Sequence, residues 1–276
     1  MKSLLSLFLS LITMAIFAQK DFEGKATYMS KTTMDMERFG NQMSEQQKKQ
    51  MMARMKNFLE KTYILNFNKN ESSFKEEVKL DAPGTSGPRW GASNGQGSIY
   101  KNLKDREMVE DVEQFSKRFL VVEPMGQPKW ELGTESKKIG QYTVYKATMT
   151  TVDTKIDWGG IFRRGRRNQE NDSTKTEDKA AEKILNVTAW YTPQIPVSSG
   201  PESYWGLPGL ILELNSDRTT MLCTEIVINP SEPITIEKPK KGSKVTREKY
   251  NKIIKVKTEE LKERFQNRRG GGRRGY

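Results

Sequence analysis

Most of the chain alternates between apolar and polar residues over short runs, which is the pattern of half-buried strands. Clusters of Gly, Pro, Asn and Ser separate these runs. Between residues 98 and 150 the short runs follow one another without long helical patterns between them, so an antiparallel meander is favoured. The predicted strands are residues 22–33, 62–67, 72–80, 98–103, 106–112, 118–123, 129–132, 135–139, 142–150, 184–191, 210–214 and 221–228, with a short edge piece at 234–237.

Two segments follow the helical period instead. Residues 43–61 begin with Ser44 and Gln47 at capping-box spacing, and a second helix is predicted from Thr246 onward. The first helix either covers one side of a sheet or docks on a partner. Each has an apolar face, formed by Met51, Met52, Met55, Phe58 and Leu59 in the first and by Tyr250, Ile254, Leu261 and Phe265 in the second.

These elements predict a mainly β protein with accessory helices. We expect a single curved antiparallel sheet or half-barrel, with one or two amphipathic helices packed on it, as one domain over residues 19–267. Residues 158–183 are polar and charged and are interpreted as a flexible surface insertion, and residues 268–276 as a disordered Gly/Arg tail.

The densest block of stiff and apolar residues lies at 189–214. Pro193 and Pro196 each fix their own φ and remove a backbone donor. The run Gly206-Leu-Pro-Gly209 predicts a type II turn with Gly209 at its positive-φ position. It leads into residues 210–214, which are apolar except for Glu213 and are interpreted as an interior strand.

Aromatic residues concentrate in and beside this block. One interpretation is a packed β corner in which Trp190, Tyr204 and Trp205 are core or lid. The other is a binding groove, since rigid aromatic loops also serve as ligand-binding walls. The groove hypothesis places five residues near its rim: Trp190, Tyr191, Tyr204, Trp205 and Leu207.

The motif over residues 206–211, Gly206, Leu207, Pro208, Gly209, Leu210 and Ile211, resembles the signature of the GLPGLI (Porph_ging) family of Bacteroidetes envelope proteins. The preceding segment 189–201 (AWYTPQIPVSSGP) agrees with it, as do outlying pieces at 98–102, 130–132, 139–142 and 146–148. The resemblance spans residues 22–257 and implies an envelope location and a fold like that of the lipoprotein-carrier half-barrel. Val144 stands where the family often has Cys, and the insertion after Thr151 is long. The resemblance implies no catalytic residues.

Residues 1–18 have the layout of a secretory signal peptide: Lys2, an apolar centre over 4–17 and a small residue at Ala18. The apolar stretch is too short for a membrane span. We therefore expect an exported protein without a transmembrane span after cleavage, located in the periplasm or at the outer membrane. The residue directly after the expected cleavage site is Gln19 and not Cys, so a lipoprotein is not expected. Cys223, the only cysteine, is interpreted as a buried small residue, with a reactive or intermolecular thiol as the alternative.

The formal net charge of +12 favours anionic partners such as envelope surfaces. Two Arg/Gly clusters supply part of it. They are interpreted as solvated charge, with contact to anionic surfaces and RGG-type nucleic-acid binding as alternatives; behind a signal peptide, nucleic acid is not the expected partner. The anionic-surface residues of this hypothesis are Arg163, Arg164, Arg166, Arg167, Arg268 and Arg269.

The chain contains no histidine. Ser-His-Asp and Cys-His nucleophile systems are therefore excluded, and a four-ligand zinc site is not expected. Phosphate-binding glycine loops do not occur in a strand-to-helix setting. Methionines including Met34 and Met36 allow a copper(I) interpretation, but they also suit gap-filling on an apolar face. We expect no metal, no cofactor and no catalytic residue.

The leading function hypothesis is a non-enzymatic envelope binding or accessory protein. It would present an apolar, aromatic groove to a lipid, a peptide or an outer-membrane partner. Two alternatives remain: a hydrolase that uses carboxylates, and a structural partner of a transporter or secretion assembly.

Overall fold

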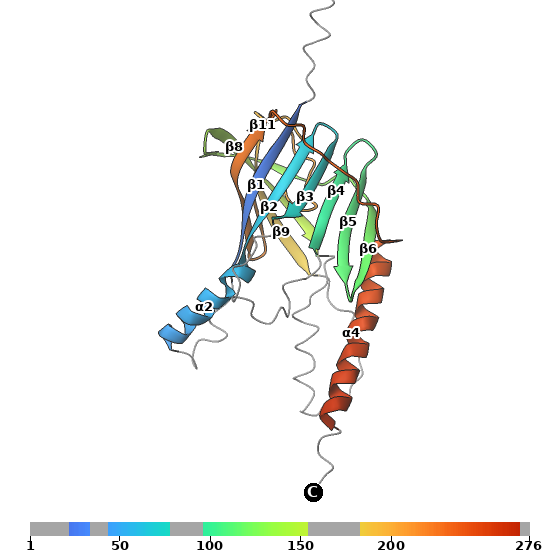
Figure 1. Cartoon of the computed structure of the whole chain (residues 1–276). Coiled ribbons are helices and arrows are strands. Elements are labelled where there is room, and N and C mark those ends of the chain that lie inside the picture. Colours follow the sequence, from blue (N-terminus) through green and yellow to red (C-terminus); the bar gives the residue numbers. More distant parts are fainter. Residues whose placement is uncertain (1–21, 34–43, 78–95, 154–182, 271–276) are drawn as a thin grey trace, which may run out of the picture.

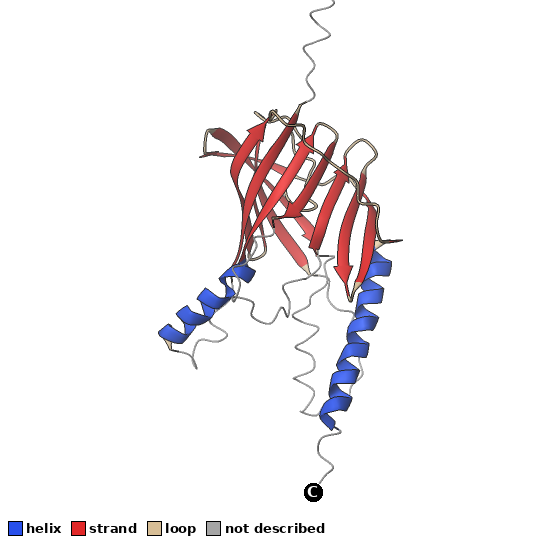
Figure 2. Ribbon diagram, viewed as in Figure 1, coloured by secondary structure: helices blue, strands red, loops and turns tan. Residues whose placement is uncertain are grey.

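A computed structural model describes residues 22–33, 44–77, 96–153 and 183–270. These residues form one twelve-stranded sheet and two helices (Figures 1 and 2). The strands are β1 (Glu23–Thr32), β2 (Glu60–Asn68), β3 (Glu71–Glu76), β4 (Gln96–Asn102), β5 (Glu107–Gln114), β6 (Lys117–Pro124), β7 (Glu131–Ile139), β8 (Tyr142–Val152), β9 (Ile184–Thr192), β10 (Leu210–Ser216), β11 (Thr219–Ile228) and β12 (Ser243–Val245). The predicted mainly β fold, a single curved sheet with accessory helices, is confirmed.

The strand order is β12-β6-β5-β4-β3-β2-β1-β11-β10-β9-β8-β7. Consecutive strands pair as two meanders, β1 to β6 and β7 to β11, and the pairing of β1 with β11 joins them. All pairs are antiparallel except β12 with β6. The sheet curves so that β8 and β9 lie behind the plane of β2 to β5 (Figure 1).

Two predicted elements differ at the edges of the sheet. In place of the two predicted strands at 129–132 and 135–139, the structure has one strand, β7, over Glu131–Ile139. A register irregularity between Leu132 and Ser136 lies at the predicted break. Residues 234–237 are not a strand. Pro233 and Pro239 deny that segment two backbone donors, and β12 pairs with the edge of β6 instead. Ile236 packs against the core without strand pairing.

The main core lies on the inner face of the curved sheet, which we define by alternate residues such as Ala26, Tyr28 and Leu65, all fully buried. Leu210, Ile211 and Leu212 are at most 1% exposed. The prediction that this run is an interior strand is therefore confirmed. An irregularity in the β9–β10 register between Ile211 and Glu213 explains how consecutive residues can all be buried.

The helices differ in how they contact the sheet. Helix α2 (Glu45–Leu59) has the predicted capping box: the Gln47 amide donates to Ser44 Oγ, and the Ser44 amide donates to Gln47 Oε1. It leads directly into β2, meets the sheet only near that end, and projects away from it (Figure 1). Its apolar face therefore does not cover the sheet, although Met51 and Met55 are partly buried.

Helix α4 (Arg247–Gly270) packs on β6 through its first turns, where Tyr250 and Ile254 join Phe119 and Val121 in a second core cluster. The Phe119 and Tyr250 rings are 5.6 Å apart in an edge-on arrangement. Of the predicted apolar face, Leu261 is partly buried. The helix continues to Gly270 and so includes Arg268 and Arg269. Several predictions lie outside the described residues: the signal peptide, Met34 and Met36, the arginines at 163–167 and residues 271–276.

Candidate functional site

The connection between β9 and β10, residues 193–209, lies across the inner face of the sheet. Lys101 on β4 fixes it there: its Nζ donates to the carbonyl oxygens of Gly200 at 2.6 Å, Glu202 at 2.8 Å and Tyr204 at 3.1 Å. The Lys101 side chain is fully buried. Burial lowers the pKa of its amine to about 7, and the Glu202 carboxylate offsets part of that effect.

Further hydrogen bonds hold the connection from other strands. The buried Ser199 hydroxyl donates to Ser72 Oγ on β3 at 2.9 Å. Just after the connection, at the start of β10, the Ile211 carbonyl oxygen accepts a hydrogen bond of 2.6 Å from the Tyr28 hydroxyl on β1. Burial raises the pKa of the Tyr28 phenol well above the usual value. The connection is therefore a fixed part of the inner face.

The turn before β10 differs from the predicted type II turn. The Gly209 amide donates to the Leu207 carbonyl oxygen at 2.8 Å, which closes a three-residue turn around Pro208. The Leu210 amide donates instead to Ile195. Gly206 has φ +92°, and a Cβ there would lie 2.9 Å from Pro128 Cδ. Glycine at 206 thus lets the 126–130 segment approach the connection.

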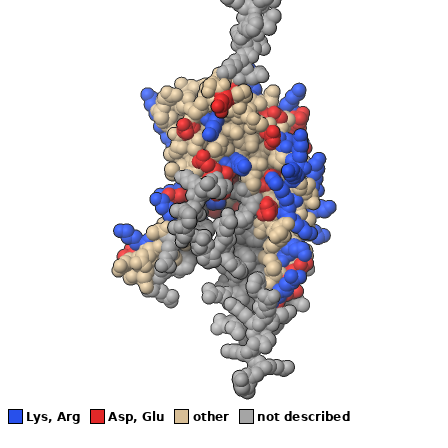
Figure 3. Space-filling view, in the orientation of Figure 1, with Lys and Arg blue, Asp and Glu red and all other residues tan. Residues whose placement is uncertain are grey.

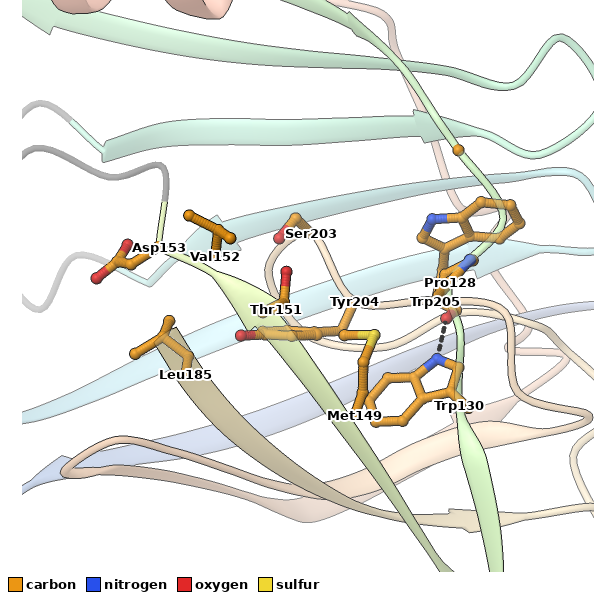
Figure 4. Close-up of a pocket in the computed structure, with 11 residues that line it drawn as sticks. Pro128, Trp130, Met149, Thr151, Val152, Asp153, Leu185, Ser203, Tyr204 and Trp205 are labelled. Atoms are coloured by element: carbon orange, nitrogen blue, oxygen red, sulfur yellow. Dashed lines mark hydrogen bonds between the residues drawn. The ribbon is translucent and has the colours of Figure 1, made fainter. Parts of the chain in front are cut away.

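A pocket of about 270 Å³ lies between the connection and the ends of β8 and β9 (Figure 4). Trp130 and Trp205 lie at one end of it, and Val152, Asp153 and Leu185 at the other. The Trp130 Nε1 donates to the Trp205 carbonyl oxygen at 2.8 Å. The described lining residues are Gly126, Pro128, Trp130, Met149, Thr151, Val152, Asp153, Leu185, Ser203, Tyr204 and Trp205.

Tyr204 forms part of the pocket wall. Its ring centroid is 6.3 Å from that of Trp130 in a tilted arrangement, and its hydroxyl is 3.2 Å from Ser216 Oγ. Asp153 has the only carboxylate among the described lining residues. Its Oδ2 lies 3.8 Å from Lys183 Nζ. The pocket is mainly apolar and aromatic, with one acidic end.

One edge of β8 is open at this pocket. Pairing between β7 and β8 ends at Glu131 and Thr148, whereas β8 continues to pair with β9 as far as Val152. Among the described residues, nothing pairs with the other edge of β8 over residues 149–152. Met149, Thr151 and Val152 of this stretch line the pocket, so the pocket has an apolar floor beside open strand backbone.

The predicted groove residues divide between three environments. Tyr204 and Trp205 line the pocket. Tyr191 and Leu207 are buried in the core, 7% and 1% exposed. Trp190 lies on the opposite face of β9, because side chains alternate along a strand; there Lys137 Nζ lies 4.2 Å from its ring centroid and 2.5 Å from Glu213 Oε2.

Sequence reasoning missed Trp130, Met149 and Leu185 as pocket residues. The available signal was the alternation within residues 142–150 and 184–191, which places Met149 and Leu185 on the same face as Ala147 and Ala189. Cys223 is buried, as predicted, and burial raises its thiol pKa to about 12. Among the described residues, no group of three His, Cys, Asp or Glu side chains forms a metal site. Neither described helix has an apolar run that would cross a membrane.

Comparison with known proteins gives a match to one family model and matches to solved structures at low similarity. Residues 130–213 match the family model Porph_ging, described as a protein of unknown function, which confirms the resemblance found at residues 206–211. No curated protein matches the chain. Similar solved structures include PNGF-II in the C2 space group, at 13% identity and a TM-score of 0.48, covering 86% of this chain and 33% of that one. PNGF-II in the P21 space group matches at 14% identity and a TM-score of 0.42, covering 76% of this chain and 29% of that one. The chain thus spans about a third of that protein.

Proposed function

We propose that this chain, whose residues 130–213 match the Porph_ging (GLPGLI) family, is an exported, non-enzymatic binding or accessory protein that holds an extended peptide segment of a partner. The observation that carries the proposal is the combination of the aromatic pocket with the open edge of β8 at residues 149–152. The pocket would take an apolar side chain, and the strand edge would pair with the peptide backbone.

The size of the pocket supports a peptide side chain as the occupant. At about 270 Å³ it is smaller than most sites that enclose a whole small molecule, which run from about 300 to 1,000 Å³. Tyr204, Trp130 and Trp205 give it stiff aromatic walls, which are well suited to an apolar anchor. An aromatic or branched side chain is the expected occupant.

The open edge supports an extended conformation for the partner. Unpaired N–H and C=O groups along a strand edge accept an added strand, which contributes main-chain hydrogen bonds, while alternate side chains enter neighbouring pockets. A peptide added beside Thr150 and Thr151 would present alternate residues to the Met149 and Thr151 side of β8. In this arrangement, backbone hydrogen bonds to β8 would supply affinity, and the fit of a side chain in the pocket would supply selectivity.

The pocket gives no support to the hydrolase alternative. Hydrolysis by paired carboxylates requires two acidic groups flanking one bond, roughly 5 to 10 Å apart. Asp153 is the only carboxylate among the described lining residues. The alternative of a structural partner in a transporter or secretion assembly stays a prediction.

The test is a selection of random peptides displayed on phage against the full chain, followed by anisotropy measurements with the enriched peptides. Two matched pairs use opposite faces of one element: Thr151→Arg fills the pocket while Thr150→Arg does not, and Trp205→Ala removes pocket wall while Trp190→Ala alters the outer face. Thr151→Arg and Trp205→Ala should each weaken binding by about tenfold or more.

The partner variants should bind as the unmodified chain does. The proposal fails if the enriched peptides share no apolar anchor, or if Thr151→Arg binds them with unchanged affinity while circular dichroism shows an intact fold.

A further inference from the structure

The surface around β12 and the start of α4 carries a dense excess of positive charge. Residues 238–257, which we call the β12–α4 ridge, contain nine Lys and Arg residues and a single acidic residue, Glu248. Figure 3 shows the basic side chains gathered along the side of the molecule where Figure 1 places β6 and α4. The ridge is far more basic than the rest of the described surface, where both signs are interspersed.

Three of these nine cations have structural partners. Arg247 Nη2 lies 2.5 Å from Glu110 and 2.6 Å from Glu123 and ties α4 to β5 and β6. Lys238 pairs with Glu107, and Lys257 with Glu260. The other six are exposed and have no acidic partner among the described residues: Lys240, Lys241, Lys244, Lys249, Lys252 and Lys255.

One of these six lysines, Lys249, lies in the first turn of α4, which begins at Arg247. The N-terminus of a helix carries partial positive charge, so a cation in the first turn is destabilising there. Thr246 caps α4, with its Oγ1 accepting from the Lys249 amide at 3.3 Å, but the charge of the Lys249 side chain remains unfavourable at this end of the helix. Mutual repulsion among the lysines adds to the cost, which an anionic partner would relieve.

We propose that the β12–α4 ridge docks on the surface of an anionic lipid bilayer. Charge complementarity carries the inference, because clustered lysines near a membrane surface each add attraction to anionic headgroups. Val256 is 46% exposed on the same side of α4 as Lys252, four residues earlier. Lysine stems and an exposed valine together suit the boundary between headgroups and acyl chains.

The residue types favour a bilayer over a nucleic acid. All six unpartnered cations are lysines, which act as point charges on flexible stems, whereas bidentate phosphate recognition favours arginine. Binding of single strands also relies on exposed aromatic rings for base stacking. Within the ridge the only aromatic residue is Tyr250, which is 6% exposed. This surface is separate from the pocket, and the inference does not depend on the peptide proposal.

The test is co-sedimentation of the full chain with vesicles of phosphatidylcholine alone or mixed equally with phosphatidylglycerol. Two independent variants remove half of the charge each: K249Q/K252Q/K255Q and K240Q/K241Q/K244Q. The control K25Q/K31Q/K75Q makes the same change in net charge at exposed lysines of β1 and β3. Because the variants differ only in where the charge is lost, other basic segments of the chain contribute equally to all.

The expected result is binding to the mixed vesicles that falls as salt is raised, with each ridge variant weakened by about 100-fold at roughly fivefold per lysine. The control should bind as the unmodified chain does. The proposal is overturned if the control loses as much affinity as the ridge variants, or if phosphatidylcholine alone binds equally well. It is also overturned if a random-sequence DNA duplex competes the chain off the vesicles through the same lysines, which would assign the ridge to nucleic acid.

Discussion

The Lys101 amine donates a hydrogen bond to the Gly200 carbonyl oxygen at 2.6 Å, across a sequence separation of 99 residues. The same amine also donates to the carbonyl oxygens of Glu202 and Tyr204, so one buried side chain serves three carbonyl acceptors. We expect Lys101→Met to lower the free energy of unfolding by roughly 3 kcal/mol, because the stem still packs but three carbonyl oxygens lose their donor. Urea unfolding measures this. Lys75→Met, at an exposed position on β3, should change it by less than about 0.5 kcal/mol.

The low pKa of Lys101 predicts a pH dependence. Its pKa is about 7 in the fold, against 10.5 for a free lysine side chain. Between these values the unfolded chain binds more protons, so this residue makes the free energy of unfolding rise with pH above about 7. Urea titrations at about pH 7 and pH 9 should show a steeper rise in the unmodified chain than in Lys101→Met. Equal slopes would contradict the assignment.

Position 209 requires glycine because the backbone of Thr192 lies too close for any side chain. A Cβ at this position would lie 2.1 Å from the Thr192 carbonyl oxygen, which cannot move without disturbing β9. We expect Gly209→Ala to cost roughly 3 kcal/mol or more in thermal or urea unfolding. Gly126→Ala is the control, since nothing lies within 4 Å of a Cβ there, and it should be close to neutral.

Two leucines on neighbouring strands test the interior position of β10. Leu212 is 1% exposed and Leu222 is 39% exposed. Leu212→Ala should lower the free energy of unfolding by about 2 to 5 kcal/mol, through lost burial and the cavity left behind. Leu222→Ala should cost less than about 1 kcal/mol. Similar losses for the two variants would be incompatible with an interior β10.

Cys223 provides a chemical probe of the inner face. The residue is 7% exposed, and burial raises the pKa of its thiol from 9 to about 12. The reactive thiolate is therefore scarce at neutral pH in the folded protein. Labelling by iodoacetamide at about pH 8 should be slow in buffer and at least tenfold faster in urea. Fast labelling of the folded chain would place this residue at an accessible position.

The alternation of apolar residues predicted the approximate bounds of most strands from β1 to β11, although β7 was expected as two strands. The capping box at Ser44 predicted the start of α2. The apolar run at residues 210–214 indicated the interior strand. Alternation is a property of each single strand. It indicates which side chains share a face, but it does not indicate which distant segment covers that face.

The inward path of the 193–209 connection shows that limit. Lys101 holds it, but lysine is rarely fully buried, and nothing near residue 101 distinguishes it from a solvated lysine. For Trp190, in contrast, the sequence did contain the signal. Alternation within residues 184–191 places Trp190 and Tyr191 on opposite faces of the strand, so Trp190 could not line the same groove as Tyr191. β12 is only three residues long and pairs in parallel with β6, so it has too little pattern to be predicted.

The place of β1 in the middle of the sheet has a consequence for how the chain is made. Its two neighbours, β2 and β11, lie about 40 and 200 residues further along, so one side of β1 stays unpaired until the last part of the sheet is available to fold. Such distant pairing makes folding slow and exposes a hydrogen-bonding edge to other chains meanwhile. A nascent chain of this kind depends on being kept apart from its copies until residues 219–228 arrive.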